Sequence, residues 1–370
     1  MDYFSKTYKE AREKFLIYAD KANANISSLY LDDILGTDNE ELSTDIAWIG
    51  NKDANHLYIH SSGIHGVEGY AGSAIQCKIL NETQFNFLPK NIAIVFIHAI
   101  NPYGMSHNRR WNENNVDLNR NFMNQELFEK SKTFCSKIYE KINYILNPKE
   151  EPYNWYLNFY WYMSGVKLFY NNQDIKNAVA GGQGKYEKGL FFCGNKLEIT
   201  PFKIINFITN TFKNITNIVH IDVHTGLGPY SFDTLLCNKT TSSEYNFIEE
   251  LEKSDDERKH VQKKEFDNGS NNISYETIGS FKDGIEKICF PNAKYYGVTQ
   301  EFGTYSGLEV IKALREENYY THYQVINKGH FSRETLLKTF YPYEDENWKN
   351  YVLDRGNIIF NTSFDFLMKN

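Results

Sequence analysis

The sequence predicts an α/β fold with a largely parallel sheet, and two observations carry this prediction. Continuous apolar runs of strand length, such as Asn91–Ala99 (NIAIVFIHA), are typical of buried central strands. These runs alternate along the chain with segments of helical periodicity, as in a sheet covered by helices. The chain has 370 residues, a length that one large α/β domain with insertions can reach.

The elements can be placed in order along the chain. Residues 4–24 carry apolar side chains at helical spacing and predict an amphipathic helix. Two short strands follow, and glycines then interrupt the chain before a helix that begins near Val67. The predicted strands are Asp45–Gly50, Leu57–His60, Asn91–Ala99, Ile218–His224 and Tyr295–Phe302. The predicted helices cover residues 4–24, about 67–80, 125–145, 200–213, 307–318, 332–340 and 345–369.

We expect residues 1–370 to form a single domain with several additions. These are an N-terminal helical extension (1–44), an insertion near the cleft (150–200), an exposed charged insertion (254–272) and C-terminal helices (310–370). Within the first insertion, residues 153–163 (YNWYLNFYWYM) hold seven aromatic residues. We interpret this segment as a partly buried aromatic cluster, with a wall of a binding cleft as the alternative.

Composition and charge exclude several classes of protein. Aromatic residues make up 16% of the chain, which excludes a mostly disordered protein. No run of about 18 apolar residues is present, so we expect no membrane-spanning helix. The net charge of -7, with both signs mixed along the chain, argues against nucleic-acid and membrane partners. The sequence leaves the oligomeric state open.

The cysteines and the first twenty residues predict a cytoplasmic protein. Five cysteines lie far apart without a Cys-x-x-Cys pair, which argues against a disulfide framework or a thiolate zinc site. Residues 1–20 are charged and lack the apolar core of a secretory signal peptide.

Two histidine motifs offer metal ligands. In HGVEG, His65 and Glu68 lie three residues apart at the start of a helix and face the same way. Both are good zinc ligands, although such a pair alone also recurs by chance in a structural role. In HIDVHTG, His220, Asp222 and His224 share one face of a strand. His224 lies at the strand end and is the best third ligand, whereas we interpret His220 as a hydrogen-bonded core histidine.

Other polar residues complete a catalytic pattern. Glu301, at the end of another predicted strand, has no local cationic partner and is a candidate base beside a metal-bound water. The loop 101–122 offers Arg109, Arg110 and Arg120, which either stabilise a developing oxyanion and bind carboxylates or form surface ion pairs. Two histidines and one carboxylate leave a fourth zinc position open, as catalytic sites do.

In this order, the motifs HGVEG, NPYG, VDLNRNF, DVHTG and EFGT resemble those of the zinc carboxypeptidase clan, the M14-type metallopeptidases and their deacylase relatives. More narrowly, Ala178–Asn195 (AVAGGQGKYEKGLFFCGN) is similar to the Gly-Gly-Gln loop of the DUF2817 family. The resemblance covers residues 45–310. It implies a three-layer α/β/α fold with a mixed, mostly parallel sheet of about eight strands.

The resemblance also implies roles for individual residues. His65, Glu68 and His224 match the Zn²⁺ ligands, and Glu301 matches the general base and acid. Arg110 matches the arginine that polarises the scissile carbonyl, with Arg109 as the alternative in register.

Three further residues match positions in the same long loop. Asn119 and Arg120 match the pair that binds a substrate carboxylate. Asp117 matches the carboxylate that orients the first histidine ligand. A late tyrosine that covers the substrate in the peptidases has no motif here, and Tyr275, Tyr295 and Tyr296 are candidates.

The implied activity is zinc-dependent cleavage of an amide bond next to a free carboxylate, as in a metallocarboxypeptidase acting on peptide C-termini. The DVHTG turn is more similar to the aspartoacylase and succinylglutamate desuccinylase types, so an N-acyl amino acid deacylase is the alternative. A non-catalytic binding protein on the same fold is less consistent with the intact ligand set. The implied partner is a peptide or an N-acyl amino acid.

Overall fold

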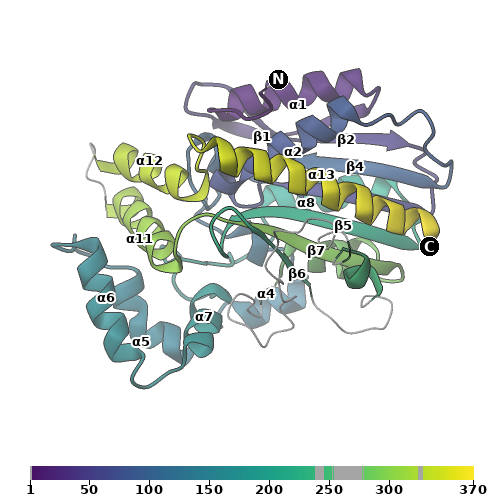
Figure 1. Ribbon diagram of the computed structural model, residues 1–370. Coiled ribbons are helices and arrows are strands. Elements are labelled where there is room, and N and C mark those ends of the chain that lie inside the picture. Colours follow the sequence, from purple (N-terminus) through teal and green to yellow (C-terminus); the bar gives the residue numbers. More distant parts are fainter. Residues whose placement is uncertain (1, 238–245, 252, 254–276, 278, 324–327) are drawn as a thin grey trace.

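The computed structural model describes residues 2–237, 246–251, 253, 277, 279–323 and 328–370. These residues form a mixed sheet of seven strands in the order β1-β2-β4-β3-β5-β7-β6 (Figure 1). The strands are β1 (Asn25–Leu35), β2 (Glu41–Gly50), β3 (His56–Ser62), β4 (Ile92–His98), β5 (Asn217–Gly226), β6 (Asp233–Leu236) and β7 (Lys294–Gly303). The central strands β4, β3, β5 and β7 are parallel, and β1, β2 and β6 are antiparallel to their neighbours. The predicted α/β class with a mixed sheet is confirmed.

Helices cover both faces of the sheet and create the three layers. On one face, α1 (Tyr8–Lys21), α2 (Gly69–Glu82) and α13 (Glu346–Lys369) form a core with side chains such as Phe96 of β4. On the other face, α8 (Ile199–Thr211) and the π-helical turn η3 (Gly284–Cys289) pack with side chains such as Val95. Neighbouring residues of a strand point to opposite faces. The apolar run of β4 is therefore buried on both sides, as its sequence predicts.

The remaining helices lie mostly in the connections after β4 and after β7. They are α3 (Pro102–Ser106), α4 (Gln125–Ser131), α5 (Lys137–Leu146), α6 (Trp155–Val166), α7 (Asn172–Ala180), α10 (Phe281–Asp283), α11 (Gly307–Tyr323) and α12 (Lys328–Phe340), with short 3-10 turns η1 (Gly66–Glu68) and η2 (Leu118–Arg120). The predicted helix 125–145 is therefore two helices. The C-terminal helices expected in 310–370 are present.

The segment 1–44 is not the helical extension that the sequence predicts. Only Tyr8–Lys21 is helical, and β1 pairs antiparallel with β2 at the edge of the sheet. Most side chains of β1 are exposed or half-buried. Because an edge strand of this kind carries many polar residues, its sequence (NISSLYLDDIL) lacks the apolar run from which the other strands are predicted. The strand β6 at the other edge is mostly buried, but its four residues (DTLL) are too few to form a recognisable apolar run.

The insertion 150–200 contains α6 and α7, which lie beside α5 (Figure 1). Phe159 and Met163 of α6 pack in a cluster with residues of α5 and α11, and Trp155 packs on Tyr319 and Tyr320 of α11. The aromatic segment 153–163 is therefore a partly buried packing cluster, as favoured from the sequence. The charged segment 254–272 lies outside the described residues.

Two expectations from composition concern the whole chain. The five cysteines form no disulfide bond with one another. Within the described ranges, no helix has both the length and the apolar composition needed to cross a bilayer.

A buried polar network attaches the edge strand β6 to the C-terminal helix. The carboxylate of Asp233 accepts hydrogen bonds from Arg355 Nε (3.0 Å), the Tyr351 hydroxyl (2.9 Å) and Gln300 Nε2 (3.0 Å). Asp233 and Arg355 are each 1% exposed. This ion pair therefore buries two opposite charges between β6, β7 and α13.

We expect Asp233→Ala to lower the free energy of unfolding by about 3–5 kcal/mol, because the Arg355 guanidinium then stays buried without this carboxylate. Urea denaturation measures the change. Asp32→Ala is the matched control, since Asp32 pairs with Lys203 (2.7 Å) through a carboxylate that is 74% exposed. The control should leave the unfolding midpoint close to that of the wild type. Equal effects of the two substitutions would contradict this role of Asp233.

Candidate metal centre

The candidate site lies where the parallel strands β3, β5 and β7 end. The carboxyl ends of parallel strands meet at one edge of a sheet, and side chains from separate strands converge there. His65 follows β3, Glu68 lies in the turn η1, His224 is near the end of β5, and Glu301 is near the end of β7. Gly66 allows the turn to pack closely, because a Cβ at this position would collide with the backbone of Gly104 and Arg109.

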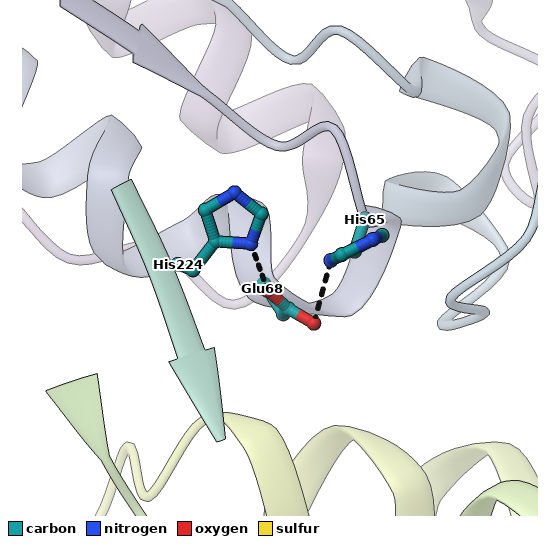
Figure 2. A group of neighbouring side chains, drawn as sticks. All are labelled: His65, Glu68 and His224. Carbon is teal, nitrogen blue, oxygen red and sulfur yellow. Dashed lines mark hydrogen bonds and ion pairs between the residues drawn. The ribbon is translucent and has the colours of Figure 1, made fainter. Parts of the chain in front are cut away.

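His65, Glu68 and His224 form a buried group of potential metal ligands. One donor atom from each residue lies within 4.8 Å of the others. His65 Nδ1 is 3.0 Å from Glu68 Oε1, and His224 Nδ1 is 3.0 Å from Glu68 Oε2 (Figure 2). The two imidazoles therefore turn the same ring nitrogen toward one carboxylate.

Two further carboxylates, those of Asp117 and Asp222, lie behind the two histidines. His65 Nε2 is 3.1 Å from Asp117 Oδ1, and His224 Nε2 is 2.8 Å from Asp222 Oδ2. Burial raises the pKa of Asp117, but the charges of His65, Arg120 and Arg110 outweigh it and hold the pKa well below its usual range. Burial likewise opposes ionisation of Asp222, yet His224 lowers the pKa of Asp222 to about 2. Both carboxylates thus stay ionised and orient the imidazoles.

This donor set fits a divalent metal ion. The buried Nδ1 of His65 has no hydrogen-bond partner within the described part of the chain, although it faces Glu68. Metal-binding histidines use one ring nitrogen for the ion and give the other to a carboxylate, and both His65 and His224 have this arrangement. Two imidazoles and one carboxylate are a common ligand set for zinc.

Glu301 lies on the neighbouring strand, directly beside His224. The two residues are opposite each other in the parallel pairing of β5 with β7, so their side chains point to the same face. Glu301 Oε1 accepts a hydrogen bond from the backbone N–H of Leu227 (2.9 Å), and the side chain is almost completely buried. Burial, together with the charge of Glu68, raises the pKa of Glu301 to about 7. A carboxyl group with this pKa can exchange a proton near neutral pH.

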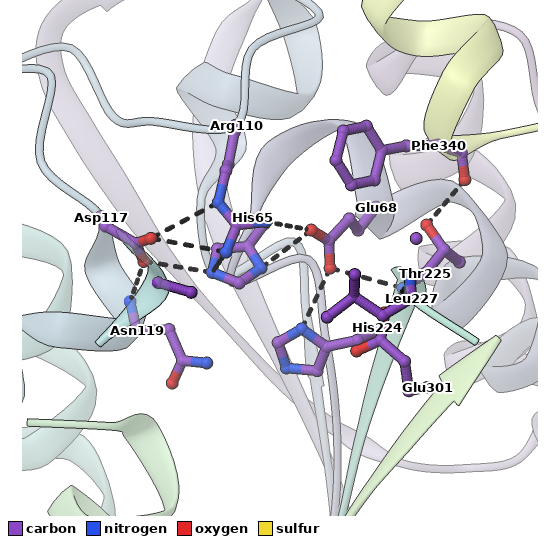
Figure 3. Close-up of polar contacts among 12 residues, drawn as sticks. His65, Glu68, Arg110, Asp117, Asn119, His224, Thr225, Leu227, Glu301 and Phe340 are labelled. Atoms are coloured by element: carbon purple, nitrogen blue, oxygen red, sulfur yellow. Dashed lines mark hydrogen bonds and ion pairs between the residues drawn. The ribbon is translucent and has the colours of Figure 1, made fainter. Parts of the chain in front are cut away.

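Arg110 and Arg109 point to different partners, which decides between them. Arg110 Nη1 donates to Glu68 Oε1 (2.7 Å), and Arg110 Nε and Nη2 lie 3.4 Å from Asp117 Oδ2 (Figure 3). Arg109 Nε donates instead to Glu317 Oε1 of α11 (2.6 Å), and both side chains are buried. Arg110 is therefore the arginine of the site. The Arg109 guanidinium is bound to Glu317 and not to the ligand group, so the predicted substrate contact of Arg109 stays a prediction that these contacts do not support.

Asn119 and Arg120 lie at the edge of the site with different accessibility. Arg120 is completely buried, and its guanidinium donates to the carbonyl oxygens of Ala180 (2.6 Å from Nη2) and Asn119 (2.7 Å from Nη1). Asn119 is half-buried, and its Oδ1 accepts a hydrogen bond from the backbone N–H of Phe281 (2.9 Å). A substrate carboxylate can thus approach the side chain of Asn119. It can bind the Arg120 guanidinium only if the Ala180 carbonyl moves away from that guanidinium.

The profile of one protein family matches residues 4–355 of the chain. That family is DUF2817, described as a protein of unknown function. This chain belongs to the DUF2817 family. No curated protein matches it.

Several solved structures are similar to this DUF2817 protein in fold. Carboxypeptidase A from Helicoverpa armigera is 13% identical, with a TM-score of 0.46 over 89% of this chain and 73% of that chain. Bovine thrombin-activatable fibrinolysis inhibitor is 13% identical, with a TM-score of 0.44 over 94% and 97%. A succinylglutamate desuccinylase/aspartoacylase from Rhodobacter sphaeroides is 10% identical, with a TM-score of 0.37 over 85% and 65%.

Two of the three tyrosine candidates, Tyr295 and Tyr296, lie away from the candidate metal centre of this DUF2817 chain. Tyr295 and Tyr296 lie at the opposite end of β7 from Glu301, about 16–20 Å away at the rise of a strand. Tyr295 donates or accepts a hydrogen bond with His220 Nδ1 (2.8 Å), and Tyr296 packs in the core. Tyr275 lies outside the described residues.

Asp222 and Glu317 have roles that the sequence does not predict, whereas His220 has the predicted one. Asp222 orients His224, and the signal was present, because residues two apart on a strand share a face. His220 fills the predicted role of a core histidine through its hydrogen bonds with Ser61 and Tyr295. Glu317 pairs with Arg109 from 208 positions away, and no local pattern marks it.

In protein freed of metal by a chelator, the stability that Glu301 contributes should fall between about pH 4.5 and 7. The folded protein keeps a proton on Glu301 up to a pKa of about 7, whereas the unfolded chain releases it near 4.5. The contribution is therefore complete below pH 4.5 and is lost as the pH rises, by about 3 kcal/mol. Urea unfolding of wild type and Glu301→Gln at several pH values measures it. If the free energy of unfolding depended on pH in the same way in both proteins, the raised pKa of Glu301 would be contradicted.

Proposed function

We propose that this protein is a zinc-dependent hydrolase that cleaves an amide bond, with His65, Glu68 and His224 as the metal ligands. The observation that carries the proposal is the buried His-Glu-His group with a second carboxylate behind each histidine. Zinc, when bound, acidifies a water molecule and polarises a carbonyl group. A structural zinc site would have all four positions filled by protein side chains.

Glu301 is the proposed general base and acid. Its pKa near 7 allows it to accept a proton from the attacking water and to release that proton afterwards. It lies beside His224 in the sheet, so its carboxylate and the ligand group face the same space. The proton then goes to the nitrogen of the departing amine, and the carboxylate returns to its starting state.

Arg110 is the proposed group that stabilises the developing oxyanion. Its guanidinium lies at the ligand group, 2.7 Å from Glu68, and is held by Asp117. A fixed positive charge in a buried site lowers the energy of a negative charge that appears during the reaction. Asp117 and Glu68 also keep this arginine from being an isolated buried charge.

The proposed substrate is a peptide with a free C-terminus, cleaved as by a metallocarboxypeptidase. We propose that the substrate carboxylate binds at Asn119, whose amide nitrogen has no hydrogen-bond partner among the residues that the structure describes. Contact with Arg120 requires that the Ala180 carbonyl leave the guanidinium. An N-acyl amino acid carries the same amide and carboxylate, so a deacylase is the alternative that the substrate panel below separates.

Protein purified without chelator should contain about one zinc ion per chain, and His65→Ala or His224→Ala should lose it. Elemental analysis by mass spectrometry measures the metal content. His98→Gln is the matched control, because His98 is also fully buried but is hydrogen-bonded to Ser73 (2.9 Å), outside the ligand group. Full zinc occupancy in the His224 variant would overturn the assignment of ligands.

Glu301→Gln should retain the metal and lower turnover by about 10²–10⁴-fold, the usual contribution of a general base. Glu309→Gln, an exposed glutamate that bonds to Ser306, is the control and should keep wild-type activity. The assay panel holds dipeptides, peptides ending in Glu or Lys, N-acyl amino acids, and the carboxamide form of each. Equal cleavage of the carboxamide forms would show that no free carboxylate is needed. Activity on N-acyl amino acids alone would establish the deacylase alternative.

A further inference from the structure

The Gly-Gly-Gln segment that follows α7 has no part in the proposed chemistry so far. Gln183, its last residue, is completely buried and uses its whole side chain within the loop. Its Nε2 donates to the carbonyl of Tyr186 (2.8 Å), and its Oε1 accepts from the N–H groups of Lys185 (2.9 Å) and Tyr186 (2.7 Å). Gln183 therefore organises the turn that leads to residues 190–193.

The backbone of Gln183 fixes the far end of this loop as well. Its N–H donates to the carbonyl of Phe191 (3.0 Å), and its carbonyl accepts from the N–H of Cys193 (2.9 Å). Phe191 has a φ of 57°, a left-handed conformation that is uncommon for a large side chain. Such a conformation persists where the surroundings impose it, and it is found most often at functional sites.

The left-handed conformation presents the ring of Phe191 to Arg110. The guanidinium carbon of Arg110 lies 5.3 Å from the centre of this ring and 5.5 Å from the ring of Trp111. The two rings meet edge to face, with centres 5.6 Å apart and an angle of 82°. All three side chains are buried. A guanidinium over an aromatic face in a desolvated site is attracted to it more strongly than in water.

We propose that Phe191 is a positioning residue for Arg110, held in place by Gln183. The carboxylates of Glu68 and Asp117 attract the guanidinium. The rings of Phe191 and Trp111 pack against it and restrict the other positions that it can adopt. Because catalysis depends on a charge that is already aimed before the reaction starts, fixing Arg110 should act on turnover more than on substrate binding. This inference rests on the role proposed for Arg110 and extends it to the Gly-Gly-Gln loop.

The test compares Phe191→Leu with Phe191→Tyr in the full-length zinc-loaded protein. Loss of the ring should lower kcat about tenfold with KM changed less than about twofold, whereas tyrosine keeps an aromatic face and should stay within about threefold of wild type. In an Arg110→Ala background, Phe191→Leu should have no further effect on kcat. An equal loss in both backgrounds, or an equal loss for tyrosine and leucine, would overturn the proposal.

Phe192→Leu is the matched control. Phe192 is the next residue, is also buried, and packs in a separate core cluster with side chains such as Val95. Its substitution should cost stability without changing kcat. A loss of kcat equal to that of Phe191→Leu would mean that the loop acts through general packing and would overturn the positioning role.

A second readout does not depend on hydrolysis. Phenylglyoxal modifies accessible arginine side chains, and peptide mass spectrometry reports the rate at Arg110. Phe191→Leu should raise this rate about fivefold, while the buried Arg120 stays unmodified as an internal reference. An unchanged rate would overturn the inference even if the protein hydrolyses amides. A raised rate in a protein without any hydrolase activity would retain the positioning of Arg110 and refute the proposed function instead.

Discussion

A buried carboxylate, Glu68, is the interaction on which the rest of the site depends. Burial favours its neutral form, but His65, Arg110 and His224 surround it and hold the pKa of Glu68 well below its usual range. These partners come from the turn after β3, the long loop after β4 and the end of β5. Removing a buried charge from such a set leaves its partners uncompensated. The three segments are therefore joined at the point where a metal ion would bind.

The long loop between β4 and α4 is fixed to the site on two sides. Arg110 contacts Glu68 and Asp117, and Arg109, the residue before it, pairs with Glu317 of α11. The carbonyl groups of Arg109 and Arg110 also accept hydrogen bonds from the N–H groups of Val67 and Gly66 (3.0 and 3.2 Å). The turn that carries two candidate ligands is thus held by backbone bonds to this loop. The C-terminal helices support the site through Glu317, although no residue of α11 enters the ligand group.

Much of the site follows from sequence because its chemistry depends on strand ends. His65, Glu68, His224 and Glu301 belong to residue types and spacings that indicate a metal site, and each lies beside a predicted strand. The choice between Arg109 and Arg110 does not follow, because adjacent residues in a loop without periodicity point in directions that only the tertiary structure sets. For the same reason the burial of Arg120 beneath Ala180 is not readable. The edge strand β1 escapes prediction because a polar, partly exposed strand carries little hydrophobic signal, and β6 escapes it because it has only four residues.

The pairing of His224 with Glu301 across β5 and β7 restricts how this chain can change during evolution. The two strands are in register over ten residue pairs, from Asn217 with Lys294 to Gly226 with Gly303. Side chains alternate between faces, so the insertion or deletion of one residue within either strand would send one of the two groups to the opposite layer. Changes of length are compatible with this site only in the connections between the strands. The site therefore depends on the hydrogen-bond register of β5 and β7 as well as on the identity of His224 and Glu301.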